Sequence, residues 1–237
     1  MLVYILNPLI TERHFLRNAD TLSFVKQILL NYPVFFIVAA GAITLFIKSR
    51  TDGLQSMRTS TSTTLDSLDD PNSGTTKFVI RAAKLFDSYK QNDIKQLQRE
   101  ASLFEAPTII RYEAGQVLMP HFDANRDADT EDSDRGGQTL ATLIVYLNDV
   151  KKGGLTRFGK LPSLIPSEDE PHLTITPKAG DALLFFPADS NGKFDERTEH
   201  EGCSAIDEKW IARIWRHSSR VQPPFGLSNL SLAKMKY

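Results

Sequence analysis

The sequence has little cysteine and no excess of charge of either sign. Its single cysteine, Cys203, cannot form an internal disulfide, so the fold depends on its core and on any bound metal. Lys and Arg number 28 against 29 Asp and Glu, a formal net charge of −1, which gives no support for a nucleic-acid-binding surface. With 237 residues, the chain has room for one domain with an appendage but not comfortably for two full domains, and its 41% of apolar residues is enough for a sizeable buried core.

A long apolar run occupies residues 28–47 and approaches the length needed to cross a bilayer. Two interpretations are open for it. In the first, residues 1–55 form an N-terminal region with a membrane anchor, which would place the catalytic domain in the endoplasmic reticulum or another secretory compartment. In the second, the run forms the first strands of the catalytic domain, and the protein is soluble in an undetermined compartment. Asn31, Pro33 and the many β-branched and aromatic residues favour strands.

A helical period begins after a polar, turn-rich stretch at residues 50–76. Between residues 77 and 104, apolar side chains recur at helical spacing on two successive segments, which predicts two helices. Asn92 is predicted to cap the second helix, and Pro107 to follow its end. The apolar positions of the two helices are Phe78, Ala82, Leu85 and Phe86, then Ile94, Leu97 and Ala101.

The pattern then changes to short apolar runs separated by Gly or Pro. The runs include TIIRY, TLATLIVYL, LTIT, DALLFF and WIARIW, and they extend from residue 108 to residue 221. Many short strands at this spacing predict an antiparallel jelly roll, so the fold class is mainly β with flanking helices. The acidic stretch at residues 127–134 lacks the glycine and the closing glutamate of a calcium loop, so it is interpreted as a solvated loop and as a candidate lid.

His121 and Asp123 are the first candidate metal ligands. Two residues apart on a strand, they point to the same side. Two imidazoles and one carboxylate hold one face of an iron(II) octahedron and leave three positions open for oxygen and substrate. A third ligand must come from elsewhere, and His200 is the best candidate because it stands near the start of a strand pair. His172, beside Pro171, is predicted to lie in a turn.

Lys209 and Arg213 are candidate anchors for an anionic co-substrate. A 2-oxoglutarate molecule that chelates a metal through one end leaves its far carboxylate to be neutralised by a buried cation. The two residues are four apart in the run KWIARIW and share one strand face, and spacing alone leaves both open.

Several ordered motifs carry a resemblance to the prolyl 4-hydroxylase family, over about half of the chain. They run from Tyr112 to His217 and include both segments that hold the metal-ligand candidates. The motifs are Tyr112-x-x-Gly115-Gln116, Pro120-His121-x-Asp123, Tyr146-Leu147-x-Asp149-Val150-x-x-Gly153-Gly154-x-Thr156-x-Phe158, Pro177-x-x-Gly180-Asp181-Ala182-Leu183-Leu184-Phe185, His200-x-Gly202-Cys203 and Lys209-Trp210-x-Ala212-x-x-Trp215-x-His217.

The resemblance implies a double-stranded β-helix over residues 56–221, followed by a C-terminal tail at 222–237. It implies a dioxygenase that uses Fe(II), O2 and 2-oxoglutarate, with L-ascorbate to restore oxidised iron. The implied reaction hydroxylates proline in a peptide or protein and releases succinate. The implied residue roles are metal ligands for His121, Asp123 and His200; co-substrate binding for Lys209, Thr156 and Tyr112; and a substrate-side position for His217.

Three departures from the family pattern bear on the substrate. Thr139 stands where the family usually has an arginine that grips the peptide, Leu118 replaces an aromatic residue, and Ser204 replaces a proline. The alternatives therefore include the same chemistry on another protein side chain or on a small molecule. Further alternatives are a catalytically silent binding module on the same fold and a cupin-type metal protein without 2-oxoglutarate. The oligomeric state is not predicted.

Overall fold

The computed structural model describes residues 3–6, 59–65, 68–86, 93–125, 135–163 and 170–235. Most of the regular structure in these ranges is β-strand, with three short α-helices and one 3-10 helix. In chain order the elements are β1 (Val3–Leu6), β2 (Thr61–Thr64), α2 (Gly74–Lys84), α3 (Ile94–Ala101), β3 (Thr108–Tyr112), β4 (Leu118–His121), β5 (Thr139–Tyr146), β6 (Thr156–Pro162), β7 (His172–Ile175), β8 (Ala182–Phe185), η4 (Glu196–Thr198), β9 (His200–Gly202), β10 (Lys209–His217) and α4 (Asn229–Ala233).

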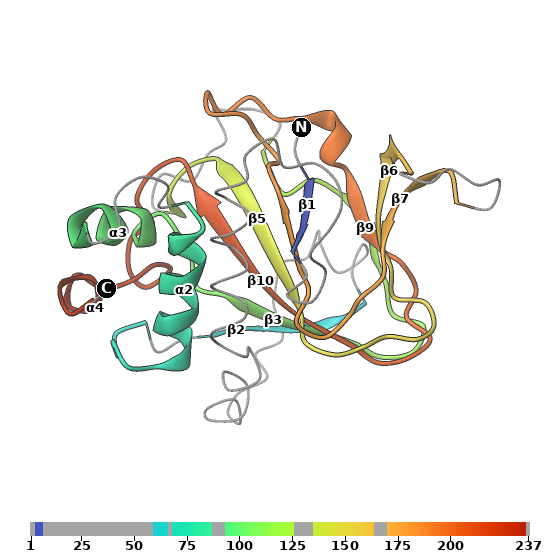
Figure 1. Ribbon diagram of the computed structural model, residues 1–237, viewed down its shortest axis with the longest axis horizontal. Helices are drawn as coiled ribbons and strands as arrows, with labels where there is room; N and C mark the ends of the chain where they lie inside the picture. Colours follow the sequence, from blue (N-terminus) through green and yellow to red (C-terminus); the bar gives the residue numbers. More distant parts are fainter. Residues whose placement is uncertain are drawn as a thin grey trace.

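The strands form two antiparallel sheets. The larger sheet has the order β1-β8-β5-β10-β3-β2, and the smaller has the order β4-β9-β6-β7. In Figure 1 the larger sheet crosses the centre of the molecule, and β6, β7 and β9 lie to its right. Neighbouring strands are seldom consecutive in sequence, as a jelly roll requires. The structure therefore confirms the predicted double-stranded β-helix.

The helices cover one face of the larger sheet, on the left of Figure 1. The side chain of Ser73 caps α2 by accepting a hydrogen bond from the Thr76 N–H. The predicted cap of the second helix is wrong, because the carboxylate of Asp93 accepts the N–H groups of Lys95 and Gln96. A one-residue shift in helix start is enough to move the cap. The predicted apolar faces are confirmed: they pack against the sheet in one hydrophobic core, which includes Phe78, Ala82, Leu97 and Ala101.

A second core fills the space between the two sheets. It contains Tyr146 and Phe185 from the larger sheet and Phe158 from the smaller, all with less than 2% exposure. The β10 strand separates the two cores, since its alternate residues face opposite sides. Ala212 and Ile214 pack with the helices, whereas Ile211 packs between the sheets. The side chains between the sheets are the ones that can build a site.

The C-terminal segment packs against the helices. Leu227 and Met235 are buried in the same core as α2 and α3, and the Ser231 hydroxyl donates to the Leu68 carbonyl.

The strand β1, from the N-terminal region, forms one edge of the larger sheet and pairs with β8. In the smaller sheet, His172 is the first residue of β7, so the prediction that it lies in a turn is wrong.

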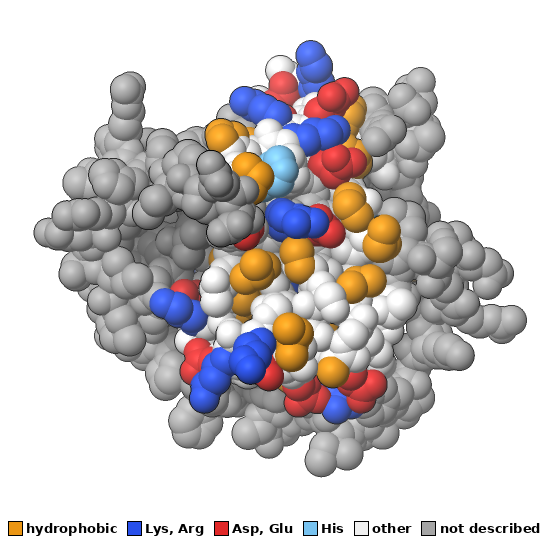
Figure 2. Space-filling view, turned by 90° about the vertical axis from the view of Figure 1, so that its right-hand side faces the viewer, with side chains coloured by type: hydrophobic (Ala, Val, Ile, Leu, Met, Phe, Trp, Pro, Cys, Tyr) orange, Lys and Arg blue, Asp and Glu red, His pale blue; other side chains and the backbone are white. Residues whose placement is uncertain are grey.

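Two segments singled out in the sequence, 28–47 and 127–134, lie outside the described residues. No helix in the described part of the chain is both long and apolar enough to cross a membrane. On the face shown in Figure 2, hydrophobic side chains are scattered among polar ones, and basic and acidic side chains stand next to each other. This mixture agrees with the net charge of −1.

Candidate active site

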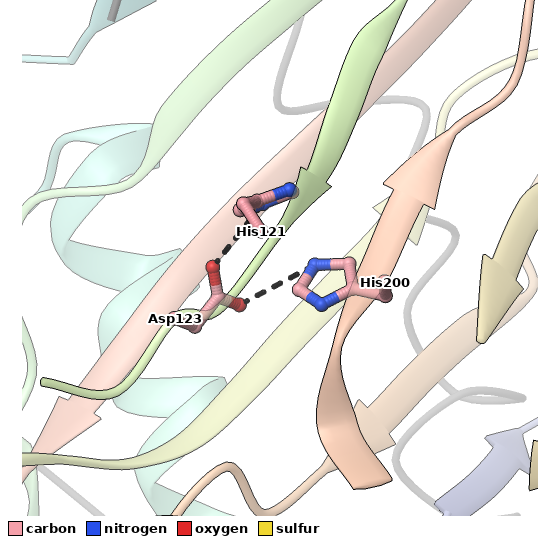
Figure 3. Close-up of side chains that lie close together, drawn as sticks. All are labelled: His121, Asp123 and His200. Carbon is pink, nitrogen blue, oxygen red and sulfur yellow. Dashed lines mark ion pairs between the residues drawn. The ribbon is translucent and has the colours of Figure 1, made fainter. Parts of the chain in front are cut away.

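Three potential metal ligands meet on the smaller sheet. His121 ends β4, Asp123 follows two residues later, and His200 begins β9. Because β4 and β9 pair with His121 directly opposite His200, residues far apart in sequence come together. One ligand atom from each of the three lies within 4.8 Å of the others. Figure 3 shows both imidazole rings turned toward the Asp123 carboxylate.

Backbone carbonyls fix the orientation of both rings. Nδ1 of His121 lies 2.9 Å from the Met119 carbonyl oxygen, and Nδ1 of His200 lies 2.9 Å from that of Thr198. A carbonyl only accepts, so Nδ1 is the donor in both rings, and in the neutral form of a ring so held Nε2 presents its lone pair. The two Nε2 atoms stand 3.6 and 3.7 Å from the carboxylate oxygens of Asp123, beyond hydrogen-bond length. This leaves the three ligand atoms facing a common point.

Two aromatic rings exclude water from the side chain of His200. Its ring stacks on Phe158, with centroids 5.4 Å apart, and meets Phe185 edge-on at 4.9 Å. Burial lowers the pKa of His200 to about 4, and the attraction of Asp123 offsets this only in part. The ring is therefore neutral at physiological pH, which is the form that binds a metal.

Asp123 is held as an anion in a buried place. Burial by itself would raise its pKa, but His200 and His121 outweigh this and hold the pKa well below its usual range. The Thr142 hydroxyl donates a 2.7 Å hydrogen bond to Oδ2 of Asp123. Thr142 was not among the predicted site residues, since a threonine inside an apolar strand carries no signal except its polarity among apolar neighbours.

The donor set fits iron(II). Two neutral imidazoles and one carboxylate, all on one side of the ion, are the ligands of non-haem iron oxygenases and leave positions open for other molecules. Hydrogen bonds from outside the ligand set orient all three side chains, as is usual at metal centres in proteins.

Lys209 is a buried cation between the sheets, with 1% exposure. Its Nζ donates to the Gly154 carbonyl at 2.7 Å and lies over the rings of Tyr112 and Tyr146. Among the described residues no carboxylate forms an ion pair with it, and burial lowers its pKa to about 8. Arg213, in contrast, has a carboxylate 3.5 Å away on Glu105. Of the two cations that the spacing left open, Lys209 is therefore the one ready to receive an added carboxylate.

Tyr112 and Thr156 lie beside Lys209. Tyr112 is the register partner of Lys209 across β3 and β10, and its hydroxyl would be 3.3 Å from a Cβ placed on Gly202. Thr156 is the register partner of Gly202, and its Oγ1 accepts a 2.9 Å hydrogen bond from the buried Tyr146 hydroxyl. Tyr146, buried, has a raised pKa and stays protonated. The three residues expected to hold the co-substrate carboxylate thus gather at one end of β10.

His217 ends β10, at its opposite end from Lys209. The ring is buried, its Nδ1 donates to the Gly137 carbonyl at 3.2 Å, and its Nε2 stands 3.7 Å from Glu105. The nearby Trp215 is the register partner of Thr142, whose hydroxyl contacts Asp123. The β10 strand therefore passes from the co-substrate residues, past the metal-ligand candidates, to His217.

A model of the 2OG-Fe(II) oxygenase superfamily matches residues 107–217. This range contains all three ligand candidates and Lys209. Residues 107–217 are therefore similar to 2OG-Fe(II) oxygenase domains. The match agrees with the metal-ligand and cation geometry described above.

Prolyl 4-hydroxylases are among the curated relatives of this segment. Probable prolyl 4-hydroxylase 6 of Arabidopsis thaliana is 39% identical over 122 residues, which cover 48% of this chain and 42% of the relative. Prolyl 4-hydroxylase 1 of the same plant is 37% identical over 111 residues, or 45% and 38% of the two chains. The matches thus span less than half the length of these relatives.

A solved structure is also similar: the viral collagen prolyl hydroxylase of Paramecium bursaria Chlorella virus-1, in its 2OG complex. It is 26% identical, covers 69% of this chain and 82% of its own, and superposes with a TM-score of 0.48.

Proposed function

We propose that the protein hydroxylates peptidyl proline in an Fe(II)- and 2-oxoglutarate-dependent reaction. The observation that carries the proposal is the pairing of a three-ligand cluster with a buried cation that lacks a carboxylate partner among the described residues. A cupin-type metal protein has no use for such a cation, whereas 2-oxoglutarate supplies its missing counter-ion. The identity to prolyl 4-hydroxylases supports proline as the target residue.

In the proposed site His121, Asp123 and His200 hold iron(II). Bound iron supplies the activation of O2 that no amino-acid side chain can provide. Overall, one oxygen atom enters the substrate C–H bond, and the other enters succinate as 2-oxoglutarate loses carbon dioxide. L-Ascorbate would return iron oxidised in unproductive turnovers to the iron(II) state.

The chain's own residues bind and orient the reactants. The Lys209 ammonium binds the far carboxylate of 2-oxoglutarate through a charge-assisted hydrogen bond, strengthened by the low-polarity surroundings. Tyr112 and Thr156 donate to the same carboxylate. The rings of Phe158 and Phe185 exclude water from the side of His200, and His217 lies at the substrate end of β10.

The test uses the purified chain with iron(II), ascorbate, oxygen and 2-oxoglutarate. Succinate is measured with and without a proline-rich peptide, and the peptide is analysed for hydroxyproline and its isomer. We expect the peptide to stimulate succinate release and to gain 4-hydroxyproline, and His200→Ala to abolish both. Succinate release that depends on His200 but ignores the peptide would assign the oxygenase to another substrate. A folded, iron-loaded protein that releases no succinate would leave the domain as a binding module.

A further inference from the structure

Arg213 is a second cation between the sheets, and the chemistry proposed above gives it no task. It shares the inner face of β10 with Lys209, Ile211, Trp215 and His217. Its charge acts on both Asp123 and His200, whose pKa values it helps to lower. Arg213 is therefore close to the metal-ligand cluster, on the side toward His217.

The guanidinium of Arg213 is positioned by two contacts. It stacks on Trp215, with its Cζ 3.6 Å from the ring centre, and it has Glu105 at 3.5 Å. The same glutamate lies 3.7 Å from Nε2 of His217, so one carboxylate stands close to both Arg213 and His217. Arg213, Trp215, His217 and Glu105 together form the Arg213 cluster. Stacking on an aromatic ring pre-organises a planar guanidinium for hydrogen bonding in its own plane.

The cluster has donors without acceptors. Nε of Arg213 and Nε1 of Trp215 are buried, and neither has a hydrogen-bond partner among the residues that the structure describes. The Arg213 side chain as a whole keeps 19% of its surface exposed, so other atoms of the group reach open space. Unsatisfied buried N–H groups are costly, and proteins rarely keep them unless a ligand or water completes them. We therefore expect a ligand that offers an acceptor oxygen to bind at the guanidinium of Arg213.

The charges around Arg213 indicate whether the acceptor oxygen belongs to a carboxylate or to an uncharged amide. Glu105 already balances Arg213, and Asp123 is a second anion close by. A substrate carboxylate would add a third negative charge to this end of the site, whereas an amide carbonyl adds none. An amide also offers an N–H, for which Glu105 is an available acceptor. The donor and acceptor pair therefore matches a peptide group.

We propose that Arg213 is a substrate-binding residue that holds an amide carbonyl of the main substrate beside the metal site, with Glu105 fixing its guanidinium. The proposal rests on the proposed function, since it takes the main substrate to be a peptide. It makes Arg213 a specificity-determining residue: its loss weakens peptide binding and leaves the affinity for 2-oxoglutarate in place, because the co-substrate is held at the Lys209 end of the strand.

The experiment measures peptide affinity by calorimetry on the full chain loaded with iron(II) and 2-oxoglutarate. Oxygen is left out, so binding is separated from turnover. Arg213→Gln is expected to weaken peptide binding by about ten-fold or more, since it removes charge-assisted hydrogen bonds. Arg213→Lys keeps the charge but loses the planar donor and is expected to recover only part of the affinity. Arg216→Gln is the matched control, since Arg216 pairs with Glu100 on the other face of the strand.

Three results would contradict the assignment of Arg213. Peptide binding within two-fold of the wild type in a folded Arg213→Gln variant would overturn the proposal, as would a loss of 2-oxoglutarate affinity with peptide affinity intact. A peptide ending in proline is compared as the amide and as the free acid: much tighter binding of the acid, lost in Arg213→Gln, would make the ligand an anion and refute the amide assignment.

Turnover of the wild type in air separates the two proposals. Arg213-dependent binding without hydroxyproline would sink the proline assignment alone. Hydroxyproline formation with an indifferent Arg213→Gln variant would sink the Arg213 assignment alone. A wild type that binds no peptide would sink both.

Discussion

The Thr142 hydroxyl donates a 2.7 Å hydrogen bond to Oδ2 of Asp123, inside the protein and away from water. Thr142 lies on β5 in the larger sheet, whereas the histidine candidates lie on the smaller sheet. The bond therefore fixes the carboxylate to a strand that carries no metal ligand, and it sets the direction in which the carboxylate faces the histidines.

Replacing Thr142 with valine is expected to weaken metal binding by about 10- to 100-fold, the usual effect of losing a hydrogen bond to a ligand side chain. Valine keeps the shape and removes the hydroxyl, so the core stays filled. Titration of iron(II) against a competing chelator gives the affinity. Thr142→Ser, which restores the hydroxyl, should bind the metal nearly as well as the wild type. Equal metal affinity in Thr142→Val would show that the bond does not orient the ligand.

Binding of 2-oxoglutarate should weaken as the pH rises above about 8. The pKa of Lys209 is lowered to about 8 in the free protein, and a bound carboxylate favours its protonated form. The affinity is therefore complete below this pKa and falls above it, to roughly one tenth between pH 7 and pH 9. Equilibrium binding to the iron-loaded protein at a series of pH values measures this. Lys209→Arg stays charged throughout, so any affinity that it retains should not vary over this range.

Alanine substitutions at Gly153 and Gly115 would distinguish the cost of backbone strain at positive φ from the cost of a steric clash. Both have φ above +60°, but a Cβ on Gly153 would clash with the Ser204 carbonyl oxygen, whereas a Cβ on Gly115 would meet no atom of the described residues within 4 Å. Gly115→Ala should lower the free energy of unfolding by about 1–2 kcal/mol from backbone strain alone. Gly153→Ala should cost more, since the backbone must also move. Urea unfolding measures both, and equal losses would remove the steric explanation.

Tyr146→Phe is expected to weaken 2-oxoglutarate binding and to spare the metal. The Tyr146 hydroxyl donates to Oγ1 of Thr156, which leaves the Thr156 proton free to point at the co-substrate. Without that donor the Thr156 hydroxyl turns elsewhere, so we expect an affinity loss of about three- to ten-fold. Calorimetry with 2-oxoglutarate and a separate iron titration give the two affinities. A variant that binds 2-oxoglutarate normally would mean that Thr156 does not depend on Tyr146.

Local patterns in the sequence predicted much of the fold and part of the site. His121 and Asp123 were visible because a strand period puts residues two apart on one side, and the strand of Lys209 was visible from its alternating apolar residues. The position of the second helix cap was missed by one residue, since Asn92 and Asp93 are equally good caps and only the backbone decides between them.

Long-range pairing was out of reach of residue spacing. By spacing Lys209 and Arg213 look alike on a strand, and in the structure the ion pair of Arg213 with Glu105 tells them apart. Glu105 and Thr142 stand in segments with no chemical motif, and they enter the site because β10 lies next to both segments. Such residues come from the register of a sheet whose strands are distant in sequence.

The pairing of β4 with β9 is short, with His121 opposite His200 and Leu118 opposite Gly202, and its register is irregular between them. An ion held by both histidines would cross-link these strands and close the long stretch of chain between them, a closure with a considerable entropic cost when it must be made by a few hydrogen bonds. Iron supply would then set the resistance of this edge to unfolding as well as the rate of reaction.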